Sequence, residues 1–120
     1  MAVSVEYQIK MLTLEDERCP FEDWFKSIKD SGTRVRIHAR ISRLQSGTLG
    51  DWKSVGSGVN ELRIDVGPGF RVYFATSGET ILILLTGGDK STQRGDVEQA
   101  RRLWKEYKNV PERFQRDFRI

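Results

Sequence analysis

The sequence predicts an α+β domain in which a small antiparallel meander sheet packs on helices. Alternating apolar residues mark one N-terminal strand and three later strands, whereas spacings of three and four mark two early helices and one late helix. The expected order is therefore β-α-α-β-β-β-α. The chain has 120 residues, of which 38% are hydrophobic and 31% are charged, and this suits one domain with a modest core.

The N-terminal half is expected to hold one strand and two helices. In "VSVEYQIKML" every second residue is apolar, and the shared face carries Val3, Val5, Tyr7, Ile9 and Met11. Pro20 suits a first helical turn, and an apolar stripe follows it in "FEDWFKSIKD". A second helix is expected from Thr33 to a stop at Ser46-Gly47. Its arginines are interpreted as a solvated face: Arg34, Arg36, Arg40 and Arg43.

The C-terminal half predicts a three-stranded meander and a helix. Alternation in "NELRIDV" and "FRVYF" places Arg63, Arg71 and Tyr73 on the outward face, away from the core. The segment "TILILLT" is apolar on both faces, which predicts the most covered strand of the sheet. The pair Gly87-Gly88 is expected to end this strand, and the last helix to start near Asp96.

The predicted domain spans residues 1–108, and residues 109–120 form a C-terminal tail whose order the pattern leaves open. Its apolar residues Phe114, Phe118 and Ile120 could dock on the core, reach a partner or fray. All three alternatives remain at this point.

Several kinds of site and location are not expected. One cysteine and one histidine are too few for a Cys/His zinc site, and neither a metal nor a cofactor is predicted. The N-terminus lacks the apolar core of a signal peptide, and the longest apolar run, "ILILL", is too short to span a bilayer. A cytoplasmic protein with no membrane partner is therefore predicted. His38, on the second helix, is interpreted as bordering the core or solvent.

The segment "LLTGGDKSTQRGD" has the composition of a phosphate-binding loop but not its spacing. A P-loop requires glycine directly before the lysine and another glycine five residues earlier. Here Asp89 precedes Lys90, and Leu84 stands in the place of the first glycine. Because a carboxylate in that position would repel phosphate, no nucleotide-binding P-loop is expected.

A basic patch on the outward face of the meander is the alternative. Arg63 and Arg71 lie on neighbouring strands, so that cross-strand proximity is expected. Lys90, Gln93 and Arg94 follow the last strand and would join them if the chain bends over that face. Such a patch suits a phosphate backbone, with Tyr73 beside it to stack on a base. These residues could equally be solvated side chains on the open side of a sheet. Three carboxylates are expected to pair with neighbouring cations: Glu61, Asp65 and Asp89.

Three longer segments carry a family resemblance. They are "FEDWFKSIKD", "RIHARISRLQSGTLGDWKSVGSGVNELRIDVGPGFRVYF" and "LLTGGDKSTQRGDVEQARRLWKEY". Together they resemble the addiction-module killer proteins, the phage-derived, HigB-like branch of the RelE/ParE toxin superfamily in bacterial type II toxin–antitoxin systems. The resemblance covers roughly residues 4–108 and implies the same strand–helix–helix–meander order.

The resemblance implies a ribosome-dependent endoribonuclease that cleaves mRNA. In such toxins the 2′-hydroxyl attacks the adjacent phosphate without a metal ion and leaves a cyclic phosphate. Arg71 matches the phosphate-stabilising arginine of the superfamily, Arg63 matches a position of further phosphate contacts, and Lys90 lies in the loop that holds other active-site groups. These three are the expected catalytic residues. The expected substrate-binding residues are Gln93, Tyr73, Arg94 and Lys53.

The resemblance also implies partners and leaves alternatives open. A cognate helix-turn-helix antitoxin, the ribosome and mRNA are the expected partners, and the oligomeric state stays open. No histidine lies in the expected site, so that acid–base work would fall to Lys90, Arg71 or a tyrosine, whose ordinary pKa values lie well above neutrality. A non-catalytic inhibitor of DNA gyrase, as in the ParE branch, and an inactive prophage-derived remnant remain as alternatives.

Overall fold

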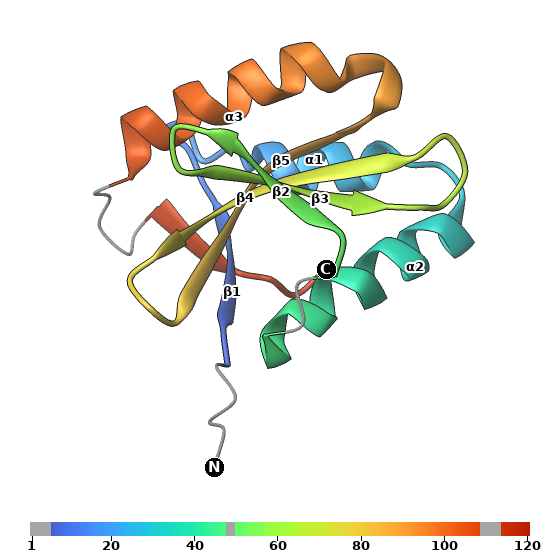
Figure 1. Cartoon of the computed structure of the whole chain (residues 1–120), viewed down its shortest axis with the longest axis horizontal. Coiled ribbons are helices and arrows are strands. Elements are labelled where there is room, and N and C mark those ends of the chain that lie inside the picture. Colours follow the sequence, from blue (N-terminus) through green and yellow to red (C-terminus); the bar gives the residue numbers. More distant parts are fainter. Residues whose placement is uncertain (1–5, 48–49, 109–113) are drawn as a thin grey trace.

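The protein is an α+β domain, as the sequence predicts, with two strands that the periodicity does not reveal (Figure 1). The computed structural model describes residues 6–47, 50–108 and 114–120. Its elements are β1 (Gln8–Leu12), α1 (Pro20–Ser27), α2 (Ser31–Ser42), η1 (Arg43–Ser46), β2 (Trp52–Gly56), β3 (Val59–Ile64), β4 (Phe70–Ser77), β5 (Ile81–Asp89), η2 (Lys90–Thr92), α3 (Gln93–Tyr107) and β6 (Gln115–Asp117). None of the helices in these ranges is long and apolar enough to cross a membrane.

All six strands form one sheet in the order β2-β3-β4-β5-β1-β6. Strands β2 to β5 make an antiparallel meander, which confirms the predicted one and extends it by β2. The first strand, β1, joins the far side of the meander parallel to β5, and β6 pairs antiparallel with β1. The sheet is therefore mixed, with a single parallel pair.

Helices cover both faces of this sheet. On one face α1, α2 and η1 bury Phe21, Phe25, Ile37 and Leu44 against the meander. On the other face α3 packs with its own apolar stripe, which consists of Ala100, Leu103, Trp104 and Tyr107. Figure 1 shows α3 and the α1/α2 pair on opposite sides of the strands. The expectation that the outward face of the meander is open is therefore wrong, because α3 folds back over it.

Strand β5 lies between β4 and β1 and has apolar side chains on both faces. Leu82 and Leu84 point into the core under α1 and α2, whereas Ile83 and Leu85 point into the core under α3. The prediction that this strand is the most covered one is confirmed: its residues from Leu82 to Gly88 are all buried.

The glycine pair lies inside β5, which continues to Asp89, so the expectation that it ends the strand is wrong. A Cβ on Gly87 would overlap the indole ring of Trp24 from α1, and a Cβ on Gly88 would overlap the carboxylate of Asp96 from α3. The two glycines thus permit close approach of one helix on each face. The last helix begins at Gln93, three residues earlier than predicted.

The C-terminal segment docks on the core, which selects one of the three alternatives for residues 114–120. The ring of Phe118 stacks on His38 at 4.8 Å, and Phe114 contacts Tyr107 edge-on at 5.7 Å. Lys10 of β1 forms an ion pair with Asp117 of β6. His38 therefore borders the core and supports the tail. Val3, Val5 and residues 109–113 lie outside the described residues.

We predict opposite effects for alanine at two glycines. Gly87→Ala should lower the free energy of unfolding by about 1–3 kcal/mol, because the methyl group displaces the Trp24 ring. Gly95→Ala is the control: no atom lies within 4 Å of its added Cβ, and alanine in α3 should stabilise by about 0.5–1 kcal/mol. Urea denaturation followed by tryptophan fluorescence measures both. Equal stabilities for Gly87→Ala and the wild type would contradict this account of the glycine pair.

Candidate functional site

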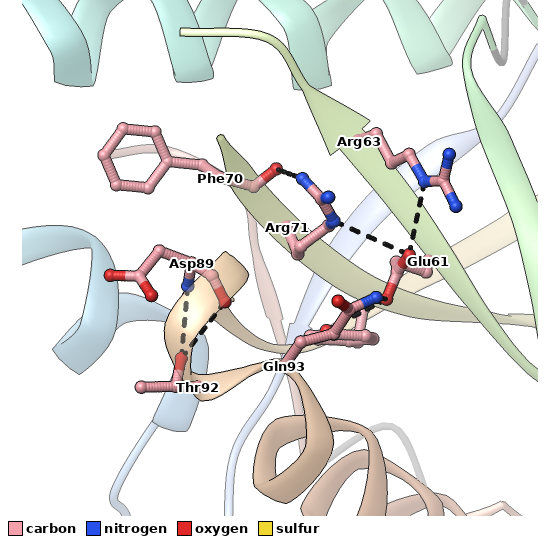
Figure 2. Close-up of polar contacts among 8 residues, drawn as sticks. Glu61, Arg63, Phe70, Arg71, Asp89, Thr92 and Gln93 are labelled. Carbon is pink, nitrogen blue, oxygen red and sulfur yellow. Dashed lines mark hydrogen bonds and ion pairs between the residues drawn. The ribbon is translucent and has the colours of Figure 1, made fainter. Parts of the chain in front are cut away.

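A buried carboxylate, Glu61, lies at the centre of the polar residues on the α3 face of the sheet. Its side chain is 0% exposed, although alternation alone placed it on an open surface. Its Oε2 accepts hydrogen bonds from the Tyr73 hydroxyl at 3.1 Å and from Nε2 of Gln93 at 2.9 Å. Its Oε1 lies 3.5 Å from Nε of Arg63 and 3.7 Å from Nε of Arg71 (Figure 2). One carboxylate thus joins β3, β4 and the first residue of α3.

The two arginines occupy directly opposite positions on β3 and β4, which confirms their predicted proximity. Like charges in such a pair repel each other unless a counter-charge lies nearby. The Glu61 carboxylate supplies it: in Figure 2 a dashed line runs from Nε of each arginine to this one side chain. The Arg71 side chain is 14% exposed and that of Arg63 is 39% exposed, so both keep contact with solvent at the rim of the site.

Arg71 holds hydrogen-bond donors in reserve. Its Nη1 donates to the carbonyl of Phe70 at 3.3 Å, but its buried Nε has no hydrogen-bond partner among the described residues. Nε is close enough to Glu61 for charge attraction but too far for a hydrogen bond. A guanidinium carries five N–H donors in a fork that matches a phosphate. Arg71 is therefore positioned by charge, and the exposed 14% of its side chain is the part that an anion can contact.

Tyr73 lies on the sheet face that the alternation predicts, opposite Val72 and Phe74, but that face is covered. Its side chain is fully buried beneath α3, beside Ala75, Ile83 and Leu85, and cannot stack on a base in this conformation. Burial raises the pKa of Tyr73 far above its ordinary value, and the negative charge of Glu61 raises it further. The phenol therefore stays protonated and serves as a donor to Glu61. The expected role in stacking on a base is wrong because α3 covers this row of the sheet.

Three further predicted site residues line a cleft between β2 and α3. The cleft has a volume of about 700 Å³, and Lys53, Gln93 and Arg94 contribute to its walls together with Glu61. Lys53 lies directly opposite Glu61 in the β2–β3 register. Arg101 of α3 fixes the outer wall by donating from Nε to the Val55 carbonyl at 2.8 Å. Three cations, Lys53, Arg94 and Arg101, and one further carboxylate, Glu98, thus line the cleft beside Glu61.

Lys90 starts η2 at the end of β5, where its side chain is exposed. Its backbone N–H donates to the carbonyl of Gly69 at 3.1 Å, and an added Cβ on Gly69 would lie 3.4 Å from Nη1 of Arg71. Lys90 and the Arg71 guanidinium therefore lie beside the same turn.

Asp89 caps η2 and so has a role other than the predicted pairing with a cation. Its Oδ1 accepts the Ser91 backbone N–H at 2.8 Å, and the side-chain hydrogen bond from Ser91 lowers the pKa of Asp89. The neighbouring Thr92 hydroxyl contacts the backbone of Asp89, as Figure 2 shows. The predicted pairing of carboxylates with cations is confirmed for Glu61. For Asp65, no ion pair appears in the described ranges.

The arrangement can bind an anion and stabilise added negative charge. Arg63, Arg71 and Gln93 converge on Glu61, and Lys53 and Arg94 extend the cationic surface along the cleft. The backbone of Lys90 lies at the Gly69 turn, which also borders Arg71. No group of three potential metal ligands occurs among the residues described by the structure. Sequence reasoning missed the central position of Glu61. The sequence did hold a signal for it: Glu61 is the one carboxylate within β3 and β4, and the alternation places it on the same face of the sheet as Arg63 and Arg71.

We predict that Tyr73→Phe destabilises the fold. The change removes the donor to Glu61, and hydrogen bonds to charged groups contribute about 1.5–3 kcal/mol to the free energy of unfolding. Tyr107→Phe is the control, because Tyr107 is buried in the same core and its ring contact with Phe114 does not require the hydroxyl. Urea denaturation of both variants measures the difference. A loss that is no larger for Tyr73→Phe than for Tyr107→Phe would count against the Glu61 hydrogen bond.

Glu61→Gln tests the counter-charge separately from side-chain shape. We expect a loss of about 2 kcal/mol at low ionic strength, below the roughly 3–5 kcal/mol of a fully buried pair, because Arg63 and Arg71 still reach water. Added salt should recover part of the loss by screening the two arginines from each other. Glu98→Gln, an exposed change in the same cleft, should stay within about 0.5 kcal/mol of the wild type. A salt-independent loss would exclude arginine repulsion as its cause.

Comparison with known proteins places this site in a family. Residues 23–108 match the family model described as "Phage derived protein Gp49-like (DUF891)". A protein of Haemophilus influenzae, described as uncharacterized, is 49% identical over 86 residues, which cover 72% of this chain and 87% of that protein. The matched residues include Glu61 with its four partners, which are Arg63, Arg71, Tyr73 and Gln93, and all residues that line the β2–α3 cleft. The chain therefore belongs to the Gp49-like phage-derived protein family, which is part of the RelE/HigB-like toxin group.

Proposed function

We propose that this protein is the toxin of a type II toxin–antitoxin module, in the HigB-like addiction-module killer branch, and that it cleaves mRNA on the ribosome. The observation that carries the proposal is the pair of arginines held by Glu61 at the rim of the site, where both side chains keep contact with solvent. In a family of the RelE/HigB-like toxin group, such a pair fits a phosphodiester whose negative charge grows during cleavage.

The proposed reaction is an internal transfer at one phosphate. The 2′-oxygen of a ribose attacks the adjacent phosphorus, the bond from phosphorus to the 5′-oxygen breaks, and a 2′,3′-cyclic phosphate remains. The 2′-hydroxyl loses a proton and the departing 5′-oxygen gains one. Because the nucleophile belongs to the substrate, the step requires no metal ion. Arg71 would contact the non-bridging oxygens, with Arg63 as the second cation.

Proton transfer is the weakest part of this site, and that weakness supports dependence on the ribosome. Tyr73 is buried and its pKa is raised, so it is unsuited as a base. Glu61 is enclosed by four partners and would act as the positioning residue for the arginines. Lys90 is exposed beside Arg71 and is the proposed donor to the 5′-oxygen. A poor acid–base set can still support cleavage if the ribosome aligns the attacking oxygen with the phosphate.

The β2–α3 cleft is the proposed path of the substrate. Lys53 and Arg94 would contact the backbone of nucleotides next to the cleaved phosphate, and the Gln93 amide would contact the phosphate or a ribose hydroxyl. Tyr73 supports this set from below, through Glu61. A cognate helix-turn-helix antitoxin is the proposed protein partner, and the site of action is the cytoplasm, where translation occurs.

A second candidate function is a ParE-like inhibitor that blocks DNA gyrase by binding. One observation favours it: among the described residues around Glu61, the carboxylate and the Tyr73 phenol are both buried. Neither is therefore accessible to a substrate as a general base. Such a surface can bind without catalysing. An inactive prophage-derived remnant would share the fold and lack both activities.

Arg71→Ala tests the nuclease directly. After brief induction, primer extension on a translated reporter mRNA should show cuts within codons for the wild type, and these cuts should vanish when translation is blocked. For Arg71→Ala we expect cleavage to fall by about 10²–10³-fold, the cost of removing one group that stabilises transition-state charge. Arg102→Ala, an exposed arginine on α3, should cleave like the wild type.

The same experiment separates the candidates. Undiminished cleavage by Arg71→Ala would refute its assignment to the site. Growth arrest with intact mRNA and altered plasmid supercoiling would favour the gyrase inhibitor. Induction without arrest, at normal protein levels, would indicate an inactive remnant.

A further inference from the structure

A second basic cleft lies beside the Glu61 site, between α2 and the strand β3. Its volume is about 410 Å³, and its charged lining consists of Arg36, Arg40, Arg43, Arg63, Asp51 and Asp65. Four guanidinium groups thus face two carboxylates, which leaves a net positive cleft. The interpretation of the α2 arginines as a solvated face is therefore incomplete. Arg34 alone turns away, and its side chain donates to the Ile28 carbonyl at the end of α1.

The arginines on α2 lie on one side of the helix. Arg36 and Arg40 on α2 and Arg43 at the start of η1 follow at spacings of four and three, which place them one above the other, about 6 Å and about 4.5 Å apart along the axis. Like charges at these spacings repel, so the row does not stabilise the helix by itself. Burial lowers the pKa of Arg40, and the neighbouring charge of Arg43 lowers it further. A bound polyanion would relieve this repulsion.

Arg63 connects this cleft to the candidate active site. Its Nε contacts Glu61, and Arg63 is also one of the residues that line the cleft under α2. Its side chain is 39% exposed, so Arg63 borders both sites and keeps contact with solvent. A chain of phosphates that passes Arg71 and Arg63 would therefore meet Arg40 and its neighbours next. A single phosphate can occupy only one of the two adjoining cationic sites, whereas a nucleic-acid strand can place successive phosphates in both.

We propose that the α2–β3 cleft binds the phosphodiester backbone of the single-stranded RNA that adjoins the segment held at the Glu61 site. This inference rests on the proposed function and names a second contact for the same substrate. The guanidinium groups would contact successive phosphates, and the apolar part of the wall, Ala39, Ile64 and Val66, would accept a ribose or a base. Asp51 and Asp65 repel any anion, so they do not distinguish RNA from an acidic peptide. The row of arginines favours a polyanion with regularly spaced charges.

The test is the binding of a fluorescent 2′-O-methyl RNA oligonucleotide to purified protein at several salt concentrations. Such RNA has no free 2′-hydroxyl, so its affinity is measured whether or not the protein cleaves RNA. The double variant Arg36→Ala/Arg43→Ala removes two exposed cations from the cleft. Arg102→Ala/Lys105→Ala removes the same charge from the exposed residues of α3 and is the matched control. Thermal unfolding monitored by circular dichroism confirms that both variants are folded.

We expect Arg36→Ala/Arg43→Ala to weaken binding by roughly 25-fold at 0.1 M salt and to reduce the slope of log K against log salt by about 1.4, since each contact to single-stranded RNA contributes about 0.7. The control should change neither quantity by more than about twofold. Equal affinity and slope in the two double variants would overturn the proposal, as would a wild-type protein that does not bind the RNA. Unchanged RNA binding combined with lost antitoxin binding would assign the cleft to a protein partner instead. The two proposals can fail separately. RNA binding that depends on Arg36 and Arg43 would support the α2–β3 cleft as a binding site even if the protein cleaved no mRNA.

Discussion

The structure depends on one buried carboxylate. Glu61 has no exposed surface, and a charge in that position is tolerated only if it is paired and hydrogen-bonded. Its partners come from three elements: Arg63 from its own strand, Arg71 and Tyr73 from β4, and Gln93 from α3. The same contacts that satisfy Glu61 hold two guanidinium groups at the rim of the sheet. Stability and the proposed phosphate site therefore share one set of interactions.

Close approach of the helices makes this burial possible. Strand β5 runs through the middle of the sheet, and its glycine pair removes side chains where Trp24 of α1 and Asp96 of α3 come nearest. With α3 seated directly on the meander, its first residue, Gln93, reaches Glu61. The polar segment after β5 consequently becomes a short capped turn and a helix start. It is neither a flexible loop nor a nucleotide cradle.

The cationic surface has two parts that meet at Arg63. One part is the cleft between β2 and α3 beside Glu61, and the other is the cleft between α2 and β3. A net charge of only +3 conceals this clustering, because acidic residues elsewhere offset the arginines. For a protein that belongs to the RelE/HigB-like toxin group, local charge density is a better guide to the proposed RNA partner than the net charge of the whole chain.

Much of the architecture follows from local sequence pattern. Periods of two and near 3.6 located four strands and three helices, because each buries a regular apolar face. The strands β2 and β6 were not predicted, because neither carries an alternation of apolar residues. Strand β2 is almost wholly exposed, and β6 is a three-residue polar strand. Their pairing depends on neighbours that are distant in sequence. The resemblance to a toxin family pointed to Arg63 through "ELRI" and to Arg71 through "GPGFRVYF", without revealing what holds them.

The sequence by itself thus determined the α+β class, the meander, the covered central strand and the proximity of the two arginines. Alternation separates the two faces of a strand, but it does not say which face a later helix will cover. Only the tertiary structure decided that α3 closes over the row containing Glu61 and Tyr73. This buried the tyrosine that was expected at the surface and made the carboxylate the centre of the site. Which face α3 covers depends on packing between segments that are far apart in the chain, and local periodicity carries no information about such contacts.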